Sequence, residues 1–377
     1  MIKSNVKQFM LNQTDWYNDM ELEYENSEYK ILVFDWWKWI RSYPSFESGN
    51  QTGVWNLTTD DLIAEIKQYD ICFFVIEEVL NTGAIPTIPT TLQNMMTELD
   101  NLNVVYIKLS EDVNFPTAES KTFSIPWFIT SDMYISKNTT IDFDYRPKDF
   151  TFNMLLGSDK HERTRAWEVL INENFIYSTY FGHQKFKLKS PKHLDDDDVI
   201  LRLTRQNISN PPGFLSKNLN TMIGINRDNR GYKISHIIPE SIYNNSHFDI
   251  AFETYSFAKP ASNLNHLHFT TEKTGKPLST GRFFIWYNCP HVVEYLRKFG
   301  FELQDYLCEY DSIIDDDKRL EAVLELIKEI GDNKNYIKKI YEDTKEARMH
   351  NQEVYKELMR TTPSNLRLWI DGQIKEK

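Results

Sequence analysis

The chain has 377 residues, with 43 Lys and Arg against 55 Asp and Glu, so its formal net charge is −12. Hydrophobic residues make up 41% and charged residues 26%, a composition that is typical of a folded globular protein and excludes a disordered acidic tail. The acidic excess argues against a protein that binds nucleic acid over its whole surface, although it leaves room for a local basic cleft. At roughly 100–200 residues per domain, this length predicts two domains.

Cysteine content and hydropathy indicate the compartment. Cys72, Cys289 and Cys308 are too few and too widely spaced for a disulfide framework or a zinc site. Residues 1–11 contain no apolar segment of the secretory type, and no apolar run approaches the ~20 residues of a membrane span. We therefore expect a cytoplasmic protein with no membrane partner. Its richness in Asn, Lys and Ile is typical of an AT-rich genome, which suggests a bacterium or a virus-infected host cell.

The N-terminal third alternates apolar and amphipathic segments. Short apolar runs predict strands over 30–34, 71–76 and 103–107. Between them, helices are predicted over 59–67, where a Thr and two Asp residues form the cap, and over 91–99. Continuous apolar strands separated by amphipathic helices indicate a parallel sheet that is covered on both faces. The first domain, 1–145, is therefore predicted to be α/β.

A polar, turn-rich stretch over 133–149 predicts the linker to a second domain. The strand pattern then restarts over 150–156, 175–180, 249–254 and 282–287, with a helix over 160–172. Two long charged helices are predicted over 316–330 and 335–359. The sequence thus predicts a second α/β domain over 146–330 and a helical C-terminal tail over 331–377.

The densest group of polar residues follows the predicted strand that ends at Glu253. Thr271 is predicted to cap a helix that begins with Glu272 and Lys273. A helix N-terminus presents unpaired N–H groups and a positive dipole end, which favour a phosphate. Lys273 would add a charge, Lys276 could lie one turn on, and a carboxylate there could accept both hydroxyls of a ribose. The alternative is a purely structural cap with an ion pair between Glu272 and Lys276.

The stretch that reads FETYS and later HFTTEKTGKPLSTGRFFIWYNCPHVVEYLRKFGFE resembles the donor-binding signature of glycosyltransferase family 10, the α-1,3-fucosyltransferases. It is closer still to a set of uncharacterised phage and bacterial relatives. The resemblance covers about 150–317 in order and is sharpest over 249–301. It implies a GT-B-like fold, in which two Rossmann-like domains face a cleft. The nucleotide sugar would be held by the second domain, and the C-terminal helices would pack back across both domains.

The resemblance also assigns roles to individual side chains. It gives Glu272 to the ribose, Lys273 to the diphosphate, and Glu253 to the sugar or nucleotide edge of the cleft. An Arg in the first helix of the donor domain would contact the phosphates, and its spacing fits Arg163 best, with Arg165 as the fallback. Such enzymes need no metal and no other cofactor, because cationic side chains and a helix terminus neutralise the leaving diphosphate. The nucleotide sugar is then a co-substrate.

Two positions depart from the family pattern. Thr254 replaces the usual Asn, and Lys276 followed by Pro277 replaces an apolar helix. For these reasons the sugar and the nucleoside stay open.

The implied reaction is attack of an acceptor hydroxyl on the anomeric carbon, with inversion, while a nucleoside diphosphate leaves. A general base is needed within reach of that hydroxyl, and it should be a carboxylate at a strand end of the first domain. Asp35 and Glu77 occupy such positions. A glycan is the expected acceptor. One alternative is a phage DNA glycosyltransferase that acts on hydroxymethylated bases, and a second is a non-catalytic sugar-binding protein on the same fold.

Overall fold

The structure of the protein is a computed structural model, which describes residues 2–4, 29–35, 59–76, 99, 102–108, 121–126, 128, 134–135, 142–156, 162–163, 165–166, 169, 179–183, 237–238, 243–244, 246–253, 270–331 and 333–376. The chain is an α/β protein built on parallel sheets, as predicted. It forms two compact units, the first from 1–132, 259–268 and 357–377, and the second from 133–258 and 269–356. The predicted boundary near residue 145 falls within the second unit.

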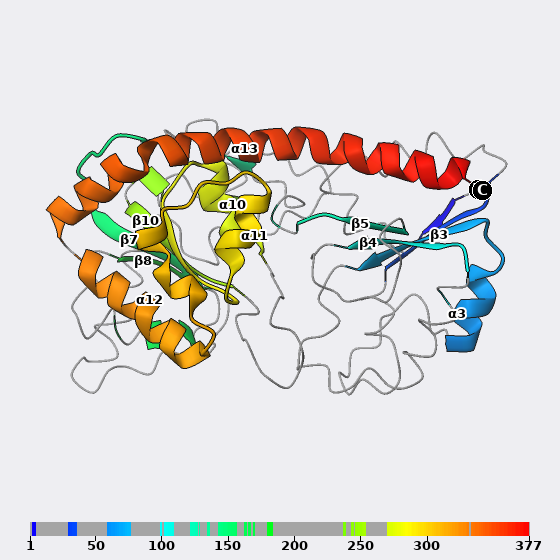
Figure 1. Ribbon diagram of the computed structural model, residues 1–377, viewed down its shortest axis with the longest axis horizontal. Coiled ribbons are helices and arrows are strands. Elements are labelled where there is room, and N and C mark those ends of the chain that lie inside the picture. Colours follow the sequence, from blue (N-terminus) through cyan, green and yellow to red (C-terminus); the bar gives the residue numbers. More distant parts are fainter. Residues whose placement is uncertain are drawn as a thin grey trace. The chain divides into compact units, whose positions relative to one another are not determined.

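The first sheet has five parallel strands in the order β1-β2-β3-β4-β5 (Figure 1). Their bounds are Ile2–Ser4, Ile31–Asp35, Ile71–Ile76, Val104–Lys108 and Thr122–Ser124. The strands predicted over 30–34, 71–76 and 103–107 are confirmed as β2, β3 and β4, and the helix predicted over 59–67 is α3, Thr59–Ile66. The helix predicted over 91–99 lies outside the described residues except for Leu99, which is helical.

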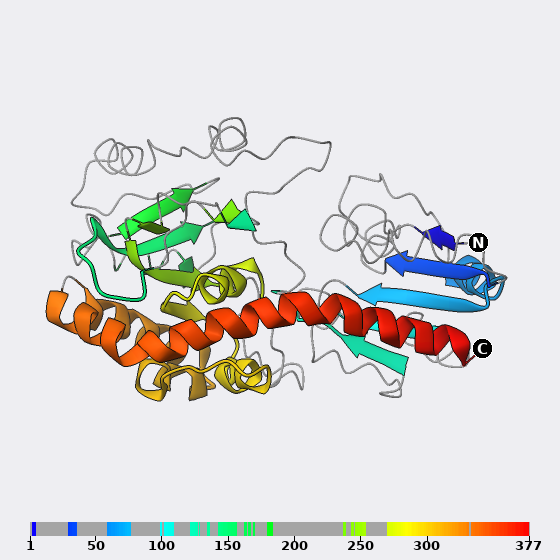
Figure 2. The same ribbon diagram turned by 90° about the horizontal axis from the view of Figure 1, so that it is seen from above.

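Both faces of this sheet are buried, which explains its continuous apolar strands. Strand residues alternate between the two faces, and Cys72 and Phe73, which point to opposite sides, are each at most 1% exposed. One face packs against the C-terminal end of α13, a helix that spans Lys334–Lys375. In Figure 2 this end of the helix lies over the first sheet. The helix residues in this core are Leu366, Ile370 and Ile374, with Trp369 at its margin.

The second sheet has four parallel strands in the order β11-β10-β7-β8. Their bounds in chain order are β7 Phe150–Leu156, β8 Thr179–His183, β10 Ser246–Phe252 and β11 Phe284–Tyr287. The strand predicted over 150–156 is confirmed. Within the described residues, β8 shares only residues 179 and 180 with the strand predicted over 175–180. β10 starts three residues before the predicted residue 249, and β11 starts two residues after the predicted residue 282.

The winding of the second sheet reverses direction at β7. The chain passes from β7 to β8 on one side, then returns to the other side of β7 for β10 and continues outward to β11. In open parallel sheets, ligands bind at the carboxyl ends of the strands where such a reversal occurs. The described strands of the first sheet follow chain order without a reversal. The edge between β7 and β10 is therefore the first place to look for a site.

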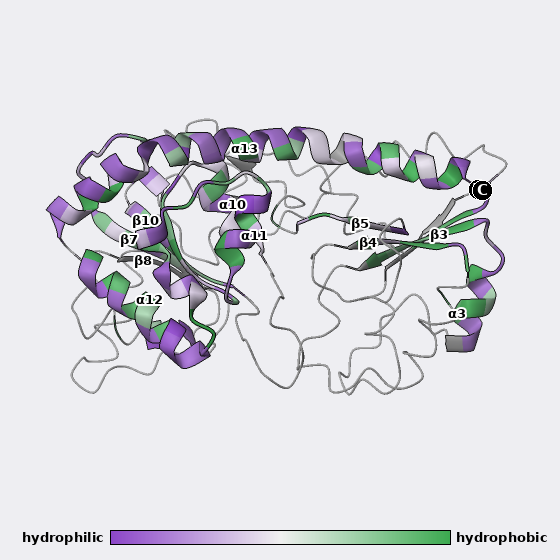
Figure 3. Cartoon of the chain, in the orientation of Figure 1, coloured by the Kyte–Doolittle hydropathy of each residue, from purple (hydrophilic) through white to green (hydrophobic). Residues whose placement is uncertain are grey.

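Helix α10, Glu272–Ser279, lies in the chain between β10 and β11. After β11 come α11, Val292–Lys298, α12, Asp316–Ile330, and α13. The helix predicted over 316–330 matches α12, whereas α13 continues well past the predicted end at residue 359 and runs through Pro363. In Figure 3 the strands are mostly hydrophobic, while α12 and α13 alternate hydrophobic and hydrophilic residues. Among the helices of the described residues, none combines the length and apolar character needed to span a membrane.

Candidate functional site

The sequence of α10 gives this helix little intrinsic stability. It has eight residues, and two of them are Gly275 and Pro277. In a helix interior, Gly costs about 1 kcal/mol and Pro about 3 kcal/mol relative to Ala. The predicted cap is confirmed, since Thr271 is the N-cap residue and its hydroxyl accepts a hydrogen bond from the Lys273 amide at 3.3 Å. The rest of the stabilisation comes from contacts with β10 at both ends of the helix.

Glu253, directly after β10, holds the start of the helix. Its side chain is fully buried. Oε1 accepts hydrogen bonds from the Thr271 amide at 2.9 Å and from the Thr274 hydroxyl at 2.6 Å, and Oε2 accepts one from the Thr271 hydroxyl at 2.6 Å. An anion here also interacts favourably with the helix dipole. Glu253 thus positions α10 and has its own acceptors engaged.

Three amide groups around the start of α10 are already paired within the chain. The Thr271 amide donates to Glu253, the Lys273 amide to the Thr271 hydroxyl, and the Thr274 amide to the Thr271 carbonyl at 3.0 Å. The expectation of unpaired N–H groups for a phosphate is therefore not met at these positions. At these three positions an anion would have to be bound by side chains instead.

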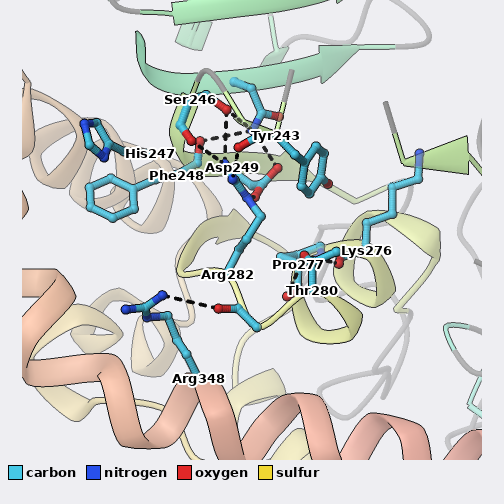
Figure 4. Close-up of polar contacts among 12 residues, drawn as sticks. Tyr243, Ser246, His247, Phe248, Asp249, Lys276, Pro277, Thr280, Arg282 and Arg348 are labelled. Carbon is cyan, nitrogen blue, oxygen red and sulfur yellow. Dashed lines mark hydrogen bonds and ion pairs between the residues drawn. The ribbon is translucent and has the colours of Figure 1, made fainter. Parts of the chain in front are cut away.

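Arg282 holds the other end of α10 to the same strand (Figure 4). Its Nε donates to Asp249 Oδ2 at 2.6 Å, Nη1 to the Tyr243 carbonyl at 2.6 Å, and Nη2 to the carbonyl and hydroxyl of Ser246, both at 3.1 Å. Asn153 of β7 donates to Asp249 Oδ1 at 2.7 Å. Asp249 and Glu253 lie on one face of β10 because they are four residues apart, so α10 is held to β10 at both ends.

The turn between α10 and Arg282 is packed against α13. Gly281 has a φ of +60°, and a Cβ built there would lie 2.6 Å from the Phe143 ring. Arg348 of α13 donates to the Gly281 carbonyl at 3.4 Å and to the Phe143 carbonyl at 2.6 Å. Because a side chain at this position would be strained and would clash, only glycine fits the turn. The position of α10 is thus fixed by three neighbouring segments.

Lys273 and Glu272 form an ion pair at the start of α10. Lys273 Nζ lies 3.0 Å from Glu272 Oε1, 3.0 Å from the Thr271 hydroxyl and 3.7 Å from Glu253 Oε2. Burial opposes the charged form of both side chains, but each favours the charge of the other. The pKa of Lys273 is raised, and the pKa of Glu272 is lowered to about 2 with a further contribution from Lys276. The purely structural alternative placed an ion pair between Glu272 and Lys276, whereas the structure pairs Glu272 with its sequence neighbour Lys273.

Of the two candidate arginines, Arg163 lies at this site. Its side chain is 3% exposed, and Nη2 donates to the carbonyl of Phe252, the last residue of β10, at 3.0 Å. Burial lowers the pKa of Arg163, and nearby carboxylates, including Glu253, oppose that shift. Arg165 instead forms an exposed ion pair with Glu321 of α12. The structure therefore brings Arg163 together with Glu253 and Lys273 and turns Arg165 away.

Lys276 is a buried cation on α10. It is 7% exposed, and within the described residues its ammonium has no hydrogen bond and no carboxylate within 4.0 Å. Burial lowers its pKa to about 8, and Lys273 adds to this shift, while Glu272 and Asp249 oppose it. In Figure 4 its side chain extends away from the Arg282 network. A buried ammonium with such surroundings would gain from an anionic ligand.

Replacing Lys276 with Met is expected to raise the free energy of unfolding at pH 7 by about 3 kcal/mol. The pKa of about 8 in the folded chain lies below the ordinary value of 10.5, so the unfolded chain binds more protons between these values. Wild-type stability therefore rises from pH 8 to 10.5, and the advantage of the variant should shrink over that window. Urea unfolding of both proteins at pH 7, 8, 9 and 10 measures this. A difference that widens with pH would contradict the assignment.

For the two candidate general bases, the structure describes the backbone of Asp35 but not its side chain, and it does not describe Glu77. Asp35 is the last residue of β2, so it lies at the carboxyl end of a strand as predicted, but its side chain is outside the described residues. Glu77 follows β3 and lies outside them as well. Both therefore stay predictions.

Residues that sequence reasoning missed also belong to this edge. Glu162, beside Arg163, is 2% exposed. Asp249 carried a signal, since it is a carboxylate inside a predicted buried strand and such a group needs a partner. Glu162 carried none, because charged residues are ordinary in a helix. With Glu162 included, the formal charges at this edge cancel. Three cations (Arg163, Lys273 and Lys276) accompany three carboxylates (Glu162, Glu253 and Glu272), and Asp249 is paired with Arg282.

In the described part of the chain, no three His, Cys, Asp or Glu side chains lie close enough together to hold a metal ion. No protein-family model matches the chain, and a search of curated proteins finds no match either. Function must therefore be argued from the chemistry of the site.

Proposed function

We propose that this chain is a glycosyltransferase that moves a sugar from a nucleoside-diphosphate sugar to a hydroxyl group of a glycan. The observation that carries the proposal is that Arg163 and Lys273 both lie beside Glu253 at the carboxyl edge of the second sheet, where the winding reverses. Lys276 lies one turn further along α10. Such an edge is where open α/β folds hold nucleotides. The resemblance of 249–301 to the donor-binding signature of family 10 points to the same chemistry.

The proposed architecture is GT-B-like, with the second unit binding the donor and the first unit serving the acceptor. Two α/β units, each with a parallel sheet, support this assignment. The general base, Asp35 or Glu77, would come from the first unit.

In the proposed mechanism, a carboxylate removes the proton of the acceptor hydroxyl as its oxygen attacks the anomeric carbon. The bond to the diphosphate oxygen breaks, and negative charge grows on the leaving group. Arg163 and Lys273 would stabilise that charge, and they are held in place before the reaction by the Phe252 carbonyl and by Glu272. Because Lys273 is paired with Glu272, it would contribute less to this stabilisation than Arg163, and the ammonium of Lys276 could supply a further charge.

A thermal-shift screen with nucleotide sugars tests the proposal. One donor is expected to raise the unfolding midpoint, because a ligand at 100 times its Kd stabilises the folded state by about 2.7 kcal/mol. Incubation of that donor with glycan acceptors, and with duplex DNA that carries hydroxymethylcytosine, then identifies the acceptor. Transfer should persist in EDTA. A panel without any shift would contradict the proposal, and binding without transfer or hydrolysis would favour the non-catalytic alternative.

A further inference from the structure

Glu162 is a buried carboxylate that has no role in the proposed mechanism. It lies in the helical segment after β7, is 2% exposed, and neither of its carboxylate oxygens has a hydrogen-bond partner within the described residues. It interacts electrostatically with Arg163 and with Tyr287, the last residue of β11. These neighbours place it near the carboxyl edge of the second sheet, beside the site already described.

The other buried carboxylates of the described residues are satisfied by the chain itself. Glu253 accepts three hydrogen bonds, and Asp249 accepts one on each oxygen. Asp311 accepts from the amides of Val292 and Val293 at the start of α11. Folded proteins pair nearly all buried polar groups, so a buried carboxylate without donors needs an explanation, and a ligand that supplies the donors is one. Glu162 is the exception within this set.

What Glu162 lacks is hydrogen-bond donors rather than positive charge. Arg163, next to it in the chain, already interacts with its charge, so a second cation would gain little. Two neutral donors side by side match the two oxygens of a carboxylate, and a pair of adjacent hydroxyls has this geometry. Glu272, to which the resemblance assigns the ribose, is engaged by Lys273 at 3.0 Å.

We propose that Glu162 binds a vicinal diol of the nucleotide-sugar donor, through one hydrogen bond to each carboxylate oxygen. This inference rests on the proposed function. The diol could belong to the ribose or to the transferred sugar, and the same experiment separates the two sources.

The test compares wild type, Glu162→Gln and the control Glu325→Gln, which changes an exposed carboxylate of α12 that pairs with Lys328. Isothermal titration uses UDP and GDP, their 2′-deoxy and 3′-deoxy counterparts, and UDP-glucose and GDP-mannose. If the ribose is bound, wild type should bind the ribose forms about tenfold more tightly than the deoxy forms, and Glu162→Gln should lose both that affinity and that preference. If the transferred sugar is bound, Glu162→Gln should weaken only the nucleotide sugars. The control should behave like wild type in each case.

Stability provides a readout that a merely structural carboxylate would not give. Because Glu162→Gln removes no hydrogen bond and leaves Arg163 bound to the Phe252 carbonyl and near Glu253, its unfolding midpoint without ligand should stay close to that of wild type. A lower midpoint with unchanged affinities would overturn the proposal. A loss of affinity that is equal for every probe, or that depends only on the base, would also overturn it. Failure of wild type to bind any probe, together with a thermal-shift panel of nucleotide sugars that shows no shift, would instead refute the proposed function, and the inference with it.

Discussion

Replacing Arg282 with Ala is expected to lower the free energy of unfolding by about 3–5 kcal/mol. The change leaves Asp249, which is 4% exposed, with a hydrogen bond from Asn153 and without its cation. It also removes the donors that pair with the carbonyls of Tyr243 and Ser246. The guanidinium further lies 4.4 Å from the centre of the Tyr243 ring, a cation–π contact that would be lost. Urea unfolding followed by circular dichroism measures the change.

Arg297→Ala is the matched control for this prediction. Arg297 pairs with Asp305, but the two side chains are 40% and 87% exposed, so its replacement should cost less than about 1 kcal/mol. The double variant Asp249→Asn with Arg282→Met removes both buried charges and should be more stable than Arg282→Ala alone. Equal losses for Arg282→Ala and Arg297→Ala would show that the network does not hold α10 to the sheet.

Local sequence signals were sufficient for elements whose structure depends on their own residues. β3 is buried on both faces, so its run of apolar residues over 71–76 marks it without reference to any neighbour. α12 begins after Asp315, whose side chain accepts from the Lys318 amide, and ends before Gly331. Both are common helix boundaries. The Thr271 cap is predictable for the same reason.

Elements that depend on distant contacts were not predictable in this way. α13 passes Pro363, which lacks an amide proton, because buried residues beyond it, Leu366 and Ile370, pack on the first sheet. The strand order of the second sheet joins β7 to β10 across a long insertion, and no local pattern indicates that pairing. The reversal of winding that marks the site is visible only in the structure.

The choice between Arg163 and Arg165 shows the same limit within the site. Two residues correspond to about 200° around a helix, so the two side chains point to nearly opposite sides. Sequence spacing allows both, whereas the structure directs Arg163 to β10 and Arg165 to α12. The sequence therefore predicted which helix carries the arginine of the site, but only the packing of that helix shows that the residue is Arg163.

Replacing Arg163 with Ala is expected to lower kcat/KM for the donor by about 10²–10³, if the protein is the proposed transferase. The guanidinium lies at the end of β10 beside Glu253, where charge on a leaving diphosphate would develop. Arg165→Ala, which removes a cation of the same type two residues away, should leave kcat/KM unchanged because its partner is an exposed carboxylate of α12. The rates are measured as transfer or hydrolysis of the donor that the thermal-shift screen identifies. Urea unfolding midpoints show whether each variant is folded.

Arg163→Lys separates the charge of this side chain from its geometry. A lysine keeps the positive charge but lacks the planar pair of donors that can contact a phosphate and the Phe252 carbonyl at once. If Arg163 must contact the leaving phosphate and the Phe252 carbonyl at the same time, the lysine variant should recover only part of the kcat/KM that Arg163→Ala loses. Full recovery would mean that charge alone is needed. Equal losses for Arg163→Ala and Arg165→Ala, with both proteins folded, would contradict a phosphate contact at β10, because only Arg163 reaches that strand.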